Sequence, residues 1–298
     1  MATVLQSLVS SIPPRLLILG ASGMLGHTVL RWFARDPGIQ VFGSTRQASA
    51  ARRLQALAPT AQLLAGVNAD NPDELHRLFA QVRPTWVINC IGLVKQLADA
   101  QDPLIALPVN AMLPHRLSAI CGLVGARLIH ISTDCVFSGR GGNYREGDAA
   151  DAEDVYGRSK LMGEVVAPHA LTLRTSIIGP ELDSCHGLLA WFLSQKQAVK
   201  GYRRARFSGL STLELAKLIE RHVLPNPELS GLYHVASSSL SKYELLGLLA
   251  TVYGHAIEIK PDDQVHLDRS LDASKFLAAT GYAAPAWTEM LAEMREFG

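Results

Sequence analysis

Tyr156 and Lys160 stand four residues apart in the segment DVYGRSKLMGE, which covers residues 154–164. Residues four apart on a helix share a face, so the two side chains can act on one ligand. A free tyrosine has a pKa near about 10, and a neighbouring positive charge favours its phenolate form. The spacing therefore predicts a proton donor, Tyr156, and a cation, Lys160, that tunes it.

Polar side chains follow an apolar run upstream of this pair. In RLIHISTDCVFSG, the residues Ser132, Thr133 and Asp134 come directly after a segment typical of a buried strand. A hydroxyl at such a strand end can hydrogen-bond a substrate carbonyl and orient it toward a tyrosine. The order of these features along the chain favours a catalytic site over a chance match.

Three glycines spaced three apart follow the first apolar run, in LILGASGMLGHTVL. A strand, a tight turn and a helix in this order bring backbone close to a pyrophosphate, and the helix N-terminus offers free N–H groups and positive potential. We expect a dinucleotide to bind here. The predicted contact residues of this turn are Gly20, Ser22, Gly23, Met24, Leu25 and Gly26.

The end of the second predicted strand, FGSTR, bears on which dinucleotide binds. Enzymes that prefer NAD usually have a carboxylate here, which binds the adenosine ribose and would repel a 2′-phosphate. This chain has none, so Ser44, Thr45 and Arg46 are predicted to hold the 2′-phosphate of NADPH, with NADH possible. The alternative for Arg46 is a solvated loop residue. Asp70 is predicted to contact the adenine amino group or to assist the next helix cap.

The fourth predicted strand ends at INCIG, where backbone should line the ribose and nicotinamide side of the cofactor. The predicted contact residues there are Asn89, Cys90, Ile91 and Gly92.

Apolar runs alternate with helical patterns through the first 174 residues, which predicts an α/β fold with a Rossmann-type, doubly wound parallel sheet. The expected strands are RLLIL (15–19), IQVFGS (39–44), AQLLAG (61–66), TWVINCIG (85–92), ARLIHIS (126–132) and LTLRTS (171–176). We expect residues 175–298 to form a smaller, mixed α/β substrate domain, with only GLYHVAS and AIEIK as strands. The chain is expected to return to the main sheet near residues 231–236.

Capping residues predict where several helices begin. Asn71 with Glu74 should open a helix that has Pro72 first and ends before Pro84. The same box is expected at two later helices, at Ser211 with Glu214 (helix 212–223) and at Ser241 with Glu244 (helix 242–253).

The composition of the 298 residues is that of a globular protein, with 48% hydrophobic and 18% charged side chains and a formal charge of +1. No global field favours nucleic acid or an anionic membrane, and the longest apolar runs are short for a bilayer. Residues 1–15 lack the basic start of a secretory signal and are expected to form a short tail or an extra turn. We therefore expect a cytoplasmic protein, monomeric or homodimeric, with four reduced cysteines and, since its histidines show no ligand spacing, no metal.

Basic residues gather in KQAVKGYRRARFSG, namely Lys196, Lys200, Arg203, Arg204 and Arg206. Such a cluster can neutralise the diphosphate of a nucleotide substrate, although charge runs are commonly solvated faces. Lys95, after the fourth strand, is predicted to overhang the site and touch substrate. Trp191 and Phe192 are interpreted as helix core rather than a platform for a nucleobase.

Taken with GASGMLG, NCIG, VNA, VYGRSKLMGE and LRTS, these segments resemble an extended short-chain dehydrogenase/reductase, within it the dTDP-4-dehydrorhamnose reductase group. The resemblance is strong over residues 15–178 and weaker beyond, through FSGLSTLELAKLI and DRSLDASKF. It implies hydride transfer from a reduced nicotinamide to the C4 ketone of a nucleotide-linked 6-deoxy-hexulose.

The resemblance also implies roles for single residues. Thr133 corresponds to the catalytic hydroxyl, Tyr156 to the proton donor, and Lys160 to the residue that holds the nicotinamide ribose and lowers the tyrosine pKa. Asp134 would lie beside the substrate, and Arg269 matches an arginine of the C-terminal pattern that is a second candidate for the diphosphate.

Two segments depart from the family pattern. Cys135 stands where the family often has an aromatic residue, and ARFSGLST replaces the family's DQ-x-G-x-PT. Two alternatives remain. One is a sugar-nucleotide epimerase or dehydratase with bound NAD, disfavoured by Cys135 and by the missing strand-end acid; the other is a nucleotide-binding regulatory subunit.

Overall fold

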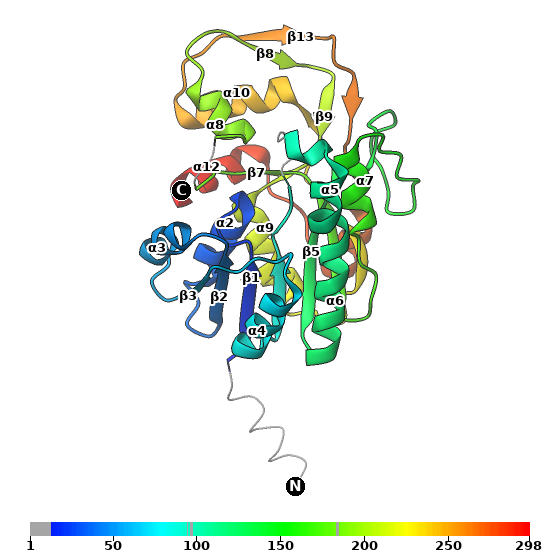
Figure 1. Cartoon of the computed structure of the whole chain (residues 1–298). Coiled ribbons are helices and arrows are strands. Elements are labelled where there is room, and N and C mark those ends of the chain that lie inside the picture. The colour runs from blue at the N-terminus through cyan, green and yellow to red at the C-terminus, as the bar shows by residue number, and fades with distance from the viewer. Residues whose placement is uncertain (1–12, 94, 96–97, 183–184) are drawn as a thin grey trace.

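A seven-stranded parallel sheet forms the centre of the molecule (Figure 1). The computed structural model describes residues 13–93, 95, 98–182 and 185–298, so most of the expected N-terminal tail or turn lies outside the described residues. The strand order is β11-β6-β5-β4-β1-β2-β3, and every neighbouring pair is parallel. These strands are β1 (Arg15–Leu19), β2 (Gln40–Thr45), β3 (Gln62–Ala65), β4 (Trp86–Asn89), β5 (Arg127–Thr133), β6 (Ala170–Thr175) and β11 (Gly231–His234). The predicted Rossmann-type sheet is confirmed.

Alternate residues of β1 point to opposite faces of the sheet, and each face is covered by helices. Leu16 and Ile18 belong to one core cluster, with side chains of the helices on that face, while Leu17 and Leu19 belong to a second cluster on the other face. The first face carries α2 (Met24–Phe33), α3 (Ala48–Leu57), α9 (Thr212–Leu218), α11 (Ser274–Thr280) and α12 (Trp287–Phe297). The second face carries α4 (Pro72–Val82) and α6 (Leu113–Val124).

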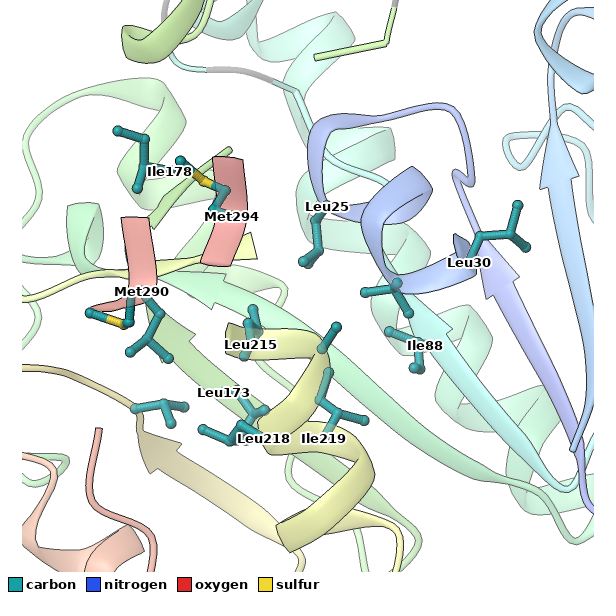
Figure 2. Close-up of a cluster of buried hydrophobic side chains, with 14 of the residues drawn as sticks. Leu25, Leu30, Ile88, Leu173, Ile178, Leu215, Leu218, Ile219, Met290 and Met294 are labelled. Carbon is teal, nitrogen blue, oxygen red and sulfur yellow. The ribbon is translucent and has the colours of Figure 1, made fainter. Parts of the chain in front are cut away.

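The first of these clusters joins the two halves of the chain. Figure 2 shows Leu25 of α2 and Leu173 of β6 in the same apolar cluster as Leu215 of α9 and Met290 of α12. Residues beyond 174 therefore cover one face of the main sheet as well as forming a separate part of the fold.

That separate part lies at the upper end of the molecule in Figure 1, beyond the carboxyl ends of the main strands. It contains small sheets and two helices, α8 (Leu188–Ser194) and α10 (Lys242–Tyr253). The short strands are β7 (Ile177–Ile178), β8 (Val199–Tyr202), β9 (Ala205–Phe207), β10 (Leu210–Ser211), β12 (Leu240–Ser241), β13 (Ile259–Asp262) and β14 (Leu267–Asp268). The prediction of only two strands beyond residue 174 was wrong, because strands of two to four residues with basic side chains give no apolar run.

The predicted helix starts are largely confirmed. The Asn71 side chain accepts a hydrogen bond from the Asp73 N–H, and α4 ends with Arg83 in the left-handed region at φ 47°. Glu74 does not close the expected box, because its carboxylate binds the Asn68 N–H and the Asn71 amide. Two other capping residues are as predicted: Ser211 caps α9 and Ser241 caps α10, the latter with a complete capping box. At α9 the expected partner, Glu214, instead accepts from the Tyr282 hydroxyl.

A longer apolar helix interrupts this regular pattern. The run Pro103–Val124 joins α5 (Pro103–Ala106), the π-helix η2 (Leu107–Met112) and α6, and by length and composition it could cross a membrane. The sequence analysis did not predict this long helix, because prolines and polar residues interrupt its apolar residues. Half of its most apolar window is buried in the fold, as in the core helix of a soluble protein, so its length alone assigns no membrane.

Candidate active site

A cavity of about 430 Å³ lies at the carboxyl ends of β1, β4 and β5, between the main sheet and the C-terminal elements. The strand order reverses at β1 and β4, and ligands of open α/β sheets bind in the crevice at such a point. Fourteen of the predicted site residues line the cavity. They are Gly23, Met24, Leu25, Asn89, Cys90, Ile91, Gly92, Lys95, Thr133, Asp134, Tyr156, Lys160, Arg206 and Arg269.

The glycine turn requires glycine at two positions for different reasons. Gly20 has φ +74°, in the left-handed region that side chains rarely adopt. A Cβ on Gly26 would lie 2.1 Å from the Gly20 carbonyl oxygen, so only glycine lets α2 start this close to β1. No described side chain caps α2, and its first turn holds no acid. The N-terminus of α2 can therefore receive an anion.

The helix α7 (Val155–Met162) carries Tyr156 and Lys160 and is fixed at both ends. At its start, Asp154 Oδ1 accepts a hydrogen bond of 2.7 Å from the Gly157 N–H. A Cβ on Gly157 would lie 2.4 Å from the Cys135 carbonyl oxygen, and one on Gly163 would lie 1.9 Å from that of Asn110. These glycines let the helix pack directly on the segment after β5 and on η2.

Lys160 is almost fully buried and directed at the end of β5. Its Nζ donates a hydrogen bond of 2.7 Å to the Ile131 carbonyl oxygen. Burial lowers the pKa of Lys160 to about 8, while the Glu164 carboxylate acts in the opposite direction. The ammonium is therefore still the main form at neutral pH.

Tyr156 differs in one respect from the sequence expectation. Burial raises the pKa of its phenol, and the Cys135 side chain raises it further, while a hydrogen bond with Thr133 opposes the rise. The expected lowering by Lys160 is not seen here, because the Lys160 ammonium is held by a backbone carbonyl. The phenol is thus protonated at neutral pH, which is the form that a proton donor needs.

Thr133 and Asp134 lie at the end of β5, beside the tyrosine. Thr133 Oγ1 accepts from the Cys135 N–H at 3.1 Å and donates to Asp134 Oδ1 at 3.2 Å. Burial raises the pKa of Asp134, and the cations Arg269 and Lys242 oppose that rise. The Asp134 side chain is therefore buried near two positive side chains.

The cavity has a basic end beside Asp134 and Cys135. Arg206 of β9, Lys242 at the start of α10 and Arg269 after β14 all line it. Lys242 was missed by the sequence analysis, since one lysine after a helix cap gives no signal. Its Nζ lies 3.7 Å from the centroid of the Phe207 ring, and burial lowers its pKa.

Arg206 and Arg269 differ in how firmly they are held. Arg269 donates from Nε to the Phe137 carbonyl oxygen at 2.8 Å and from Nη1 to Cys135 Sγ at 3.5 Å. Arg206 donates to the Ser239 carbonyl oxygen at 3.0 Å and is partly exposed. Arg206 and Lys242 are therefore freer to meet a ligand than Arg269, whose guanidinium also braces the segment after β5.

Lys95 overhangs the cavity, as predicted for its position. Its Nζ lies 2.7 Å from Asp154 Oδ2 and 5.9 Å from the centroid of the Tyr156 ring. It thus connects the segment after β4 to the cap of the helix that carries the tyrosine.

Most of the predicted basic cluster lies away from the site. Of its five members, only Arg206 lines the cavity. Lys200 pairs with Asp262 at 3.0 Å, Arg203 pairs with Asp263, and Arg204 contacts His266 at 2.8 Å. Of the two interpretations, the solvated face fits Lys200 and Arg203, which pair with acidic side chains at the β8–β13 sheet, while Arg206 keeps the predicted contact with a diphosphate as a prediction.

Several other predicted residues do not line the cavity. Ser44 and Thr45 are buried at the end of β2, where Thr45 Oγ1 donates to the Gln47 carbonyl oxygen at 3.1 Å. Arg46 is exposed beyond them, and Asp70 is exposed before α4. Gly20, Ser22 and Gly26 form the turn beneath the lining residues, so contact of all these groups with the cofactor stays a prediction.

Three further predictions concern the cysteines, a metal and the aromatic pair of α8. The four cysteines are unpaired, and no described group of three or more potential ligands could hold a metal ion. Phe192 is fully buried, as predicted, whereas Trp191 is 39% exposed and is not part of the core.

Comparison with known proteins places these features in context. The chain matches the family described as RmlD substrate binding domain over residues 14–296. The probable low-salt glycan biosynthesis reductase Agl14 of Haloferax volcanii is 29% identical, over 93% of this chain and 96% of that protein. The methionine adenosyltransferase 2 subunit beta of Bos taurus is 24% identical, over 80% of this chain and 72% of its own length.

A solved structure shares the fold. The dTDP-4-dehydrorhamnose reductase of Bacillus anthracis, in complex with NADP, has a TM-score of 0.76 and 19% identity, covering 96% of this chain and 100% of that chain. At this identity the likeness concerns the fold alone.

Proposed function

The chain belongs to the RmlD substrate binding domain family, and from this premise we propose that it is an NADPH-dependent reductase of a nucleotide-linked 4-dehydro-6-deoxy-sugar. One observation carries the proposal. Thr133, Tyr156 and Lys160 line the same cavity as the N-terminal turn of α2, so an acid and a dinucleotide site share one space.

The residues of the turn and of the β4 end fit a dinucleotide. The first turn of α2 contains no acid, and its N-cap residue, Gly23, supplies no side-chain cap. Because Gly26 has no Cβ, α2 can begin in direct contact with the turn after β1. Such an end binds a pyrophosphate through backbone N–H groups. Arg46, exposed after a strand end without an acid, is the residue proposed to select the 2′-phosphate of NADPH over NADH.

The residues around the tyrosine then assist reduction of a ketone. NADPH, when bound, supplies the hydride. Thr133 Oγ1 positions the ketone oxygen, and Tyr156 donates the proton that this oxygen gains as the C4 alcohol forms. Lys160, charged at neutral pH, binds the nicotinamide ribose.

The basic end of the cavity supports a nucleotide diphosphate on the sugar. Arg206, Lys242 and Arg269 come from three separate segments and converge there. Two phosphates need this much positive charge to be held out of bulk water. Asp134 stands between these cations and Thr133, a position suited to a sugar hydroxyl.

Two alternatives differ in testable ways. The relatives named methionine adenosyltransferase 2 subunit beta favour a regulatory subunit as the second candidate. A regulatory subunit would bind NADPH without turnover, while an epimerase or dehydratase would carry NAD as purified. An intact set of Thr133, Tyr156 and Lys160 in one cavity favours catalysis over the regulatory subunit. Cys135 and the missing acid at the end of β2 disfavour the epimerase or dehydratase.

The test is NADPH oxidation with freshly generated dTDP-4-dehydro-6-deoxy-sugars, each assayed with and without a 3,5-epimerase. We expect NADPH to be consumed only when a keto-sugar is present, and dependence on the epimerase would identify the L-hexulose as substrate. Tight NADPH binding with no turnover on any of these sugars would contradict the proposal and favour the regulatory subunit.

A further inference from the structure

A buried ion pair lies directly behind the catalytic pair. Glu164 follows α7, and Arg174 lies in β6. The guanidinium donates from Nε to Oε1 and from Nη2 to Oε2 of Glu164, each at 2.7 Å. The side chains are only 5% and 8% exposed, for Arg174 and Glu164 respectively. A bidentate pair of this kind is fixed in orientation, not only in charge.

The pair connects several strands that shape the site. Ser132 Oγ, at the end of β5, donates to Glu164 Oε1 at 2.7 Å. On the other side, Arg174 Nη1 lies 3.2 Å from Nε2 of His234 in β11, and His234 Nδ1 lies 3.0 Å from the Tyr144 carbonyl oxygen. Because Nε2 accepts from the guanidinium, His234 is neutral here and donates from Nδ1.

Glu164 and Lys160 act on successive residues of β5. Lys160 Nζ is bonded to the Ile131 carbonyl oxygen, and Glu164 holds the Ser132 hydroxyl. Glu164 lies just beyond the end of α7, where its backbone N–H donates to the Leu161 carbonyl oxygen at 3.1 Å. The carboxylate is therefore held next to the strand end that the ammonium approaches.

The other groups near Lys160 carry no negative charge at neutral pH. Burial raises the pKa of Cys90, after β4, to about 12, and burial lowers the pKa of His130 in β5 well below its usual value. On η2, Asn110 is uncharged, and on α7 itself Tyr156 is protonated. In the described part of the chain, Glu164 is the carboxylate that acts on Lys160.

We propose that Glu164 is a positioning residue of this active site, whose carboxylate, oriented by Arg174, holds the Ser132 end of β5 and keeps Lys160 charged. The proposal rests on the proposed function for its meaning in catalysis. The charge of Lys160 in the folded protein can, however, be measured whether or not the protein reduces a sugar.

Substitutions that change charge but little shape separate this role from simple packing. In Glu164→Gln the amide oxygen can still accept from Ser132, but the negative charge is gone, so Lys160 loses its proton more readily. In Arg174→Gln the carboxylate loses its counter-ion and attracts the ammonium more strongly, so Lys160 holds its proton longer. The double variant removes both charges and should return close to the parent.

The measurement is the dissociation constant of NADPH as a function of pH, by fluorescence, from about pH 6.5 to about pH 10. Because the ammonium form of Lys160 binds the ribose, affinity falls as pH rises through the pKa of this residue, which is about 8 in the unmodified protein. We expect the midpoint to move about one pH unit lower in Glu164→Gln and higher in Arg174→Gln. Lys160→Met should abolish the midpoint, and Glu289→Gln, an exposed carboxylate on α12, should leave it unchanged.

An unchanged midpoint in both single variants would overturn the proposal. A shift of both midpoints in the same direction would also overturn it. The two variants remove opposite charges, so an effect of charge must move their midpoints in opposite directions. If Glu164→Gln fails to fold by circular dichroism, the comparison is between Arg174→Gln and the double variant, where the double variant must have the lower midpoint.

The titration needs no sugar substrate, so it can be separated from the proposed function. Shifts of the expected signs in a protein that reduces no keto-sugar would retain the role of Glu164 and reject the reductase. An active reductase whose midpoints do not move would do the reverse.

Discussion

The two walls of the cavity are built by different means. The cofactor wall consists of the carboxyl ends of β1, β4 and β5, three neighbouring strands of one sheet, together with α2 and α7. The substrate wall consists of short strands and the start of α10, contributed by residues 205–207, 242–245 and 267–269. The first wall is positioned by the continuous parallel pairing of the main sheet, and the second by backbone pairing between strands of two or three residues.

Because of this difference, we expect the cofactor wall to determine the chemistry and the substrate wall to determine which substrate binds. On the cofactor wall, glycines at positions 20, 26, 157 and 163 allow backbone contacts that no side chain could replace. The substrate wall instead presents three positive side chains, Arg206 in β9, Lys242 at the start of α10 and Arg269 after β14. We therefore expect substitutions on the first wall to abolish catalysis or folding, and substitutions on the second to weaken substrate binding.

The largest expected effect is at the acid. Tyr156→Phe removes the proton donor but keeps the ring, so kcat should fall about a hundredfold or more while NADPH binding is nearly unchanged. Steady-state kinetics and a fluorescence titration of NADPH measure the two quantities. Tyr202→Phe, in β8 and outside the cavity, is the matched control. Full activity of Tyr156→Phe would remove this residue from the role of acid.

The next effect tests the cofactor wall by its backbone. Gly26→Ala would place its methyl group 2.1 Å from the Gly20 carbonyl oxygen, whereas in Gly23→Ala the nearest atom is 3.4 Å away. We expect Gly26→Ala to lower the free energy of unfolding by about 2–3 kcal/mol through overpacking. Gly23→Ala should keep its stability and lose affinity for NADPH only. Equal melting temperatures for the two variants would mean that the turn is not the rigid element described here.

On the substrate wall the expected effect is smaller and falls on KM. Lys242→Met and Arg206→Ala should each raise KM for the nucleotide sugar about tenfold, with little change in NADPH affinity, because each removes a charge that meets the diphosphate. Lys200→Ala and Arg203→Ala are the controls, since both side chains pair with acids at the end of β13, away from the cavity. A rise in KM in the controls as well would restore the whole basic cluster as a binding surface.

The smallest effect concerns cofactor preference. Arg46 is exposed, so its contact with a 2′-phosphate is screened by solvent. Arg46→Ala should weaken NADPH several-fold, by about 1 kcal/mol, and leave NADH unchanged. The matched control is Arg52→Ala, an exposed residue of α3. Equal losses of affinity for NADPH and NADH would mean that Arg46 does not contact the 2′-phosphate.

The two walls also differ in how far the sequence predicts them. On the cofactor wall the strands are apolar runs, with a glycine after β1 and hydroxyl residues at the end of β5, so fold and motif agree. On the substrate wall, Lys242 and Leu267 enter the cavity only because β9 pairs with both β12 and β14. Pairing between strands of two or three residues leaves no pattern in the sequence. The basic run likewise does not show that the β8–β13 pairing gives Lys200 and Arg203 acidic partners.

Burial effects are a second part that the sequence could not supply. The spacing of Tyr156 and Lys160 predicts a tuned phenol, yet burial raises the pKa of Tyr156, and the Lys160 ammonium is held by Ile131. Likewise, no motif in the sequence links Glu164, after α7, with Arg174 of β6. Their ion pair forms only in the folded chain. The roles of these residues depend on depth and partners, which a motif does not contain.

The measurement that tests the central claim most directly uses NADPH with deuterium at both hydrogen positions of C4 of the nicotinamide, incubated with the protein and its nucleotide keto-sugar. If the cavity joins an acid to a dinucleotide site as described, mass spectrometry and proton NMR will show one deuterium at C4 of the product sugar, and Tyr156→Phe will form this product about a hundredfold more slowly. A product sugar without deuterium, or equal rates in the two proteins, would contradict the account.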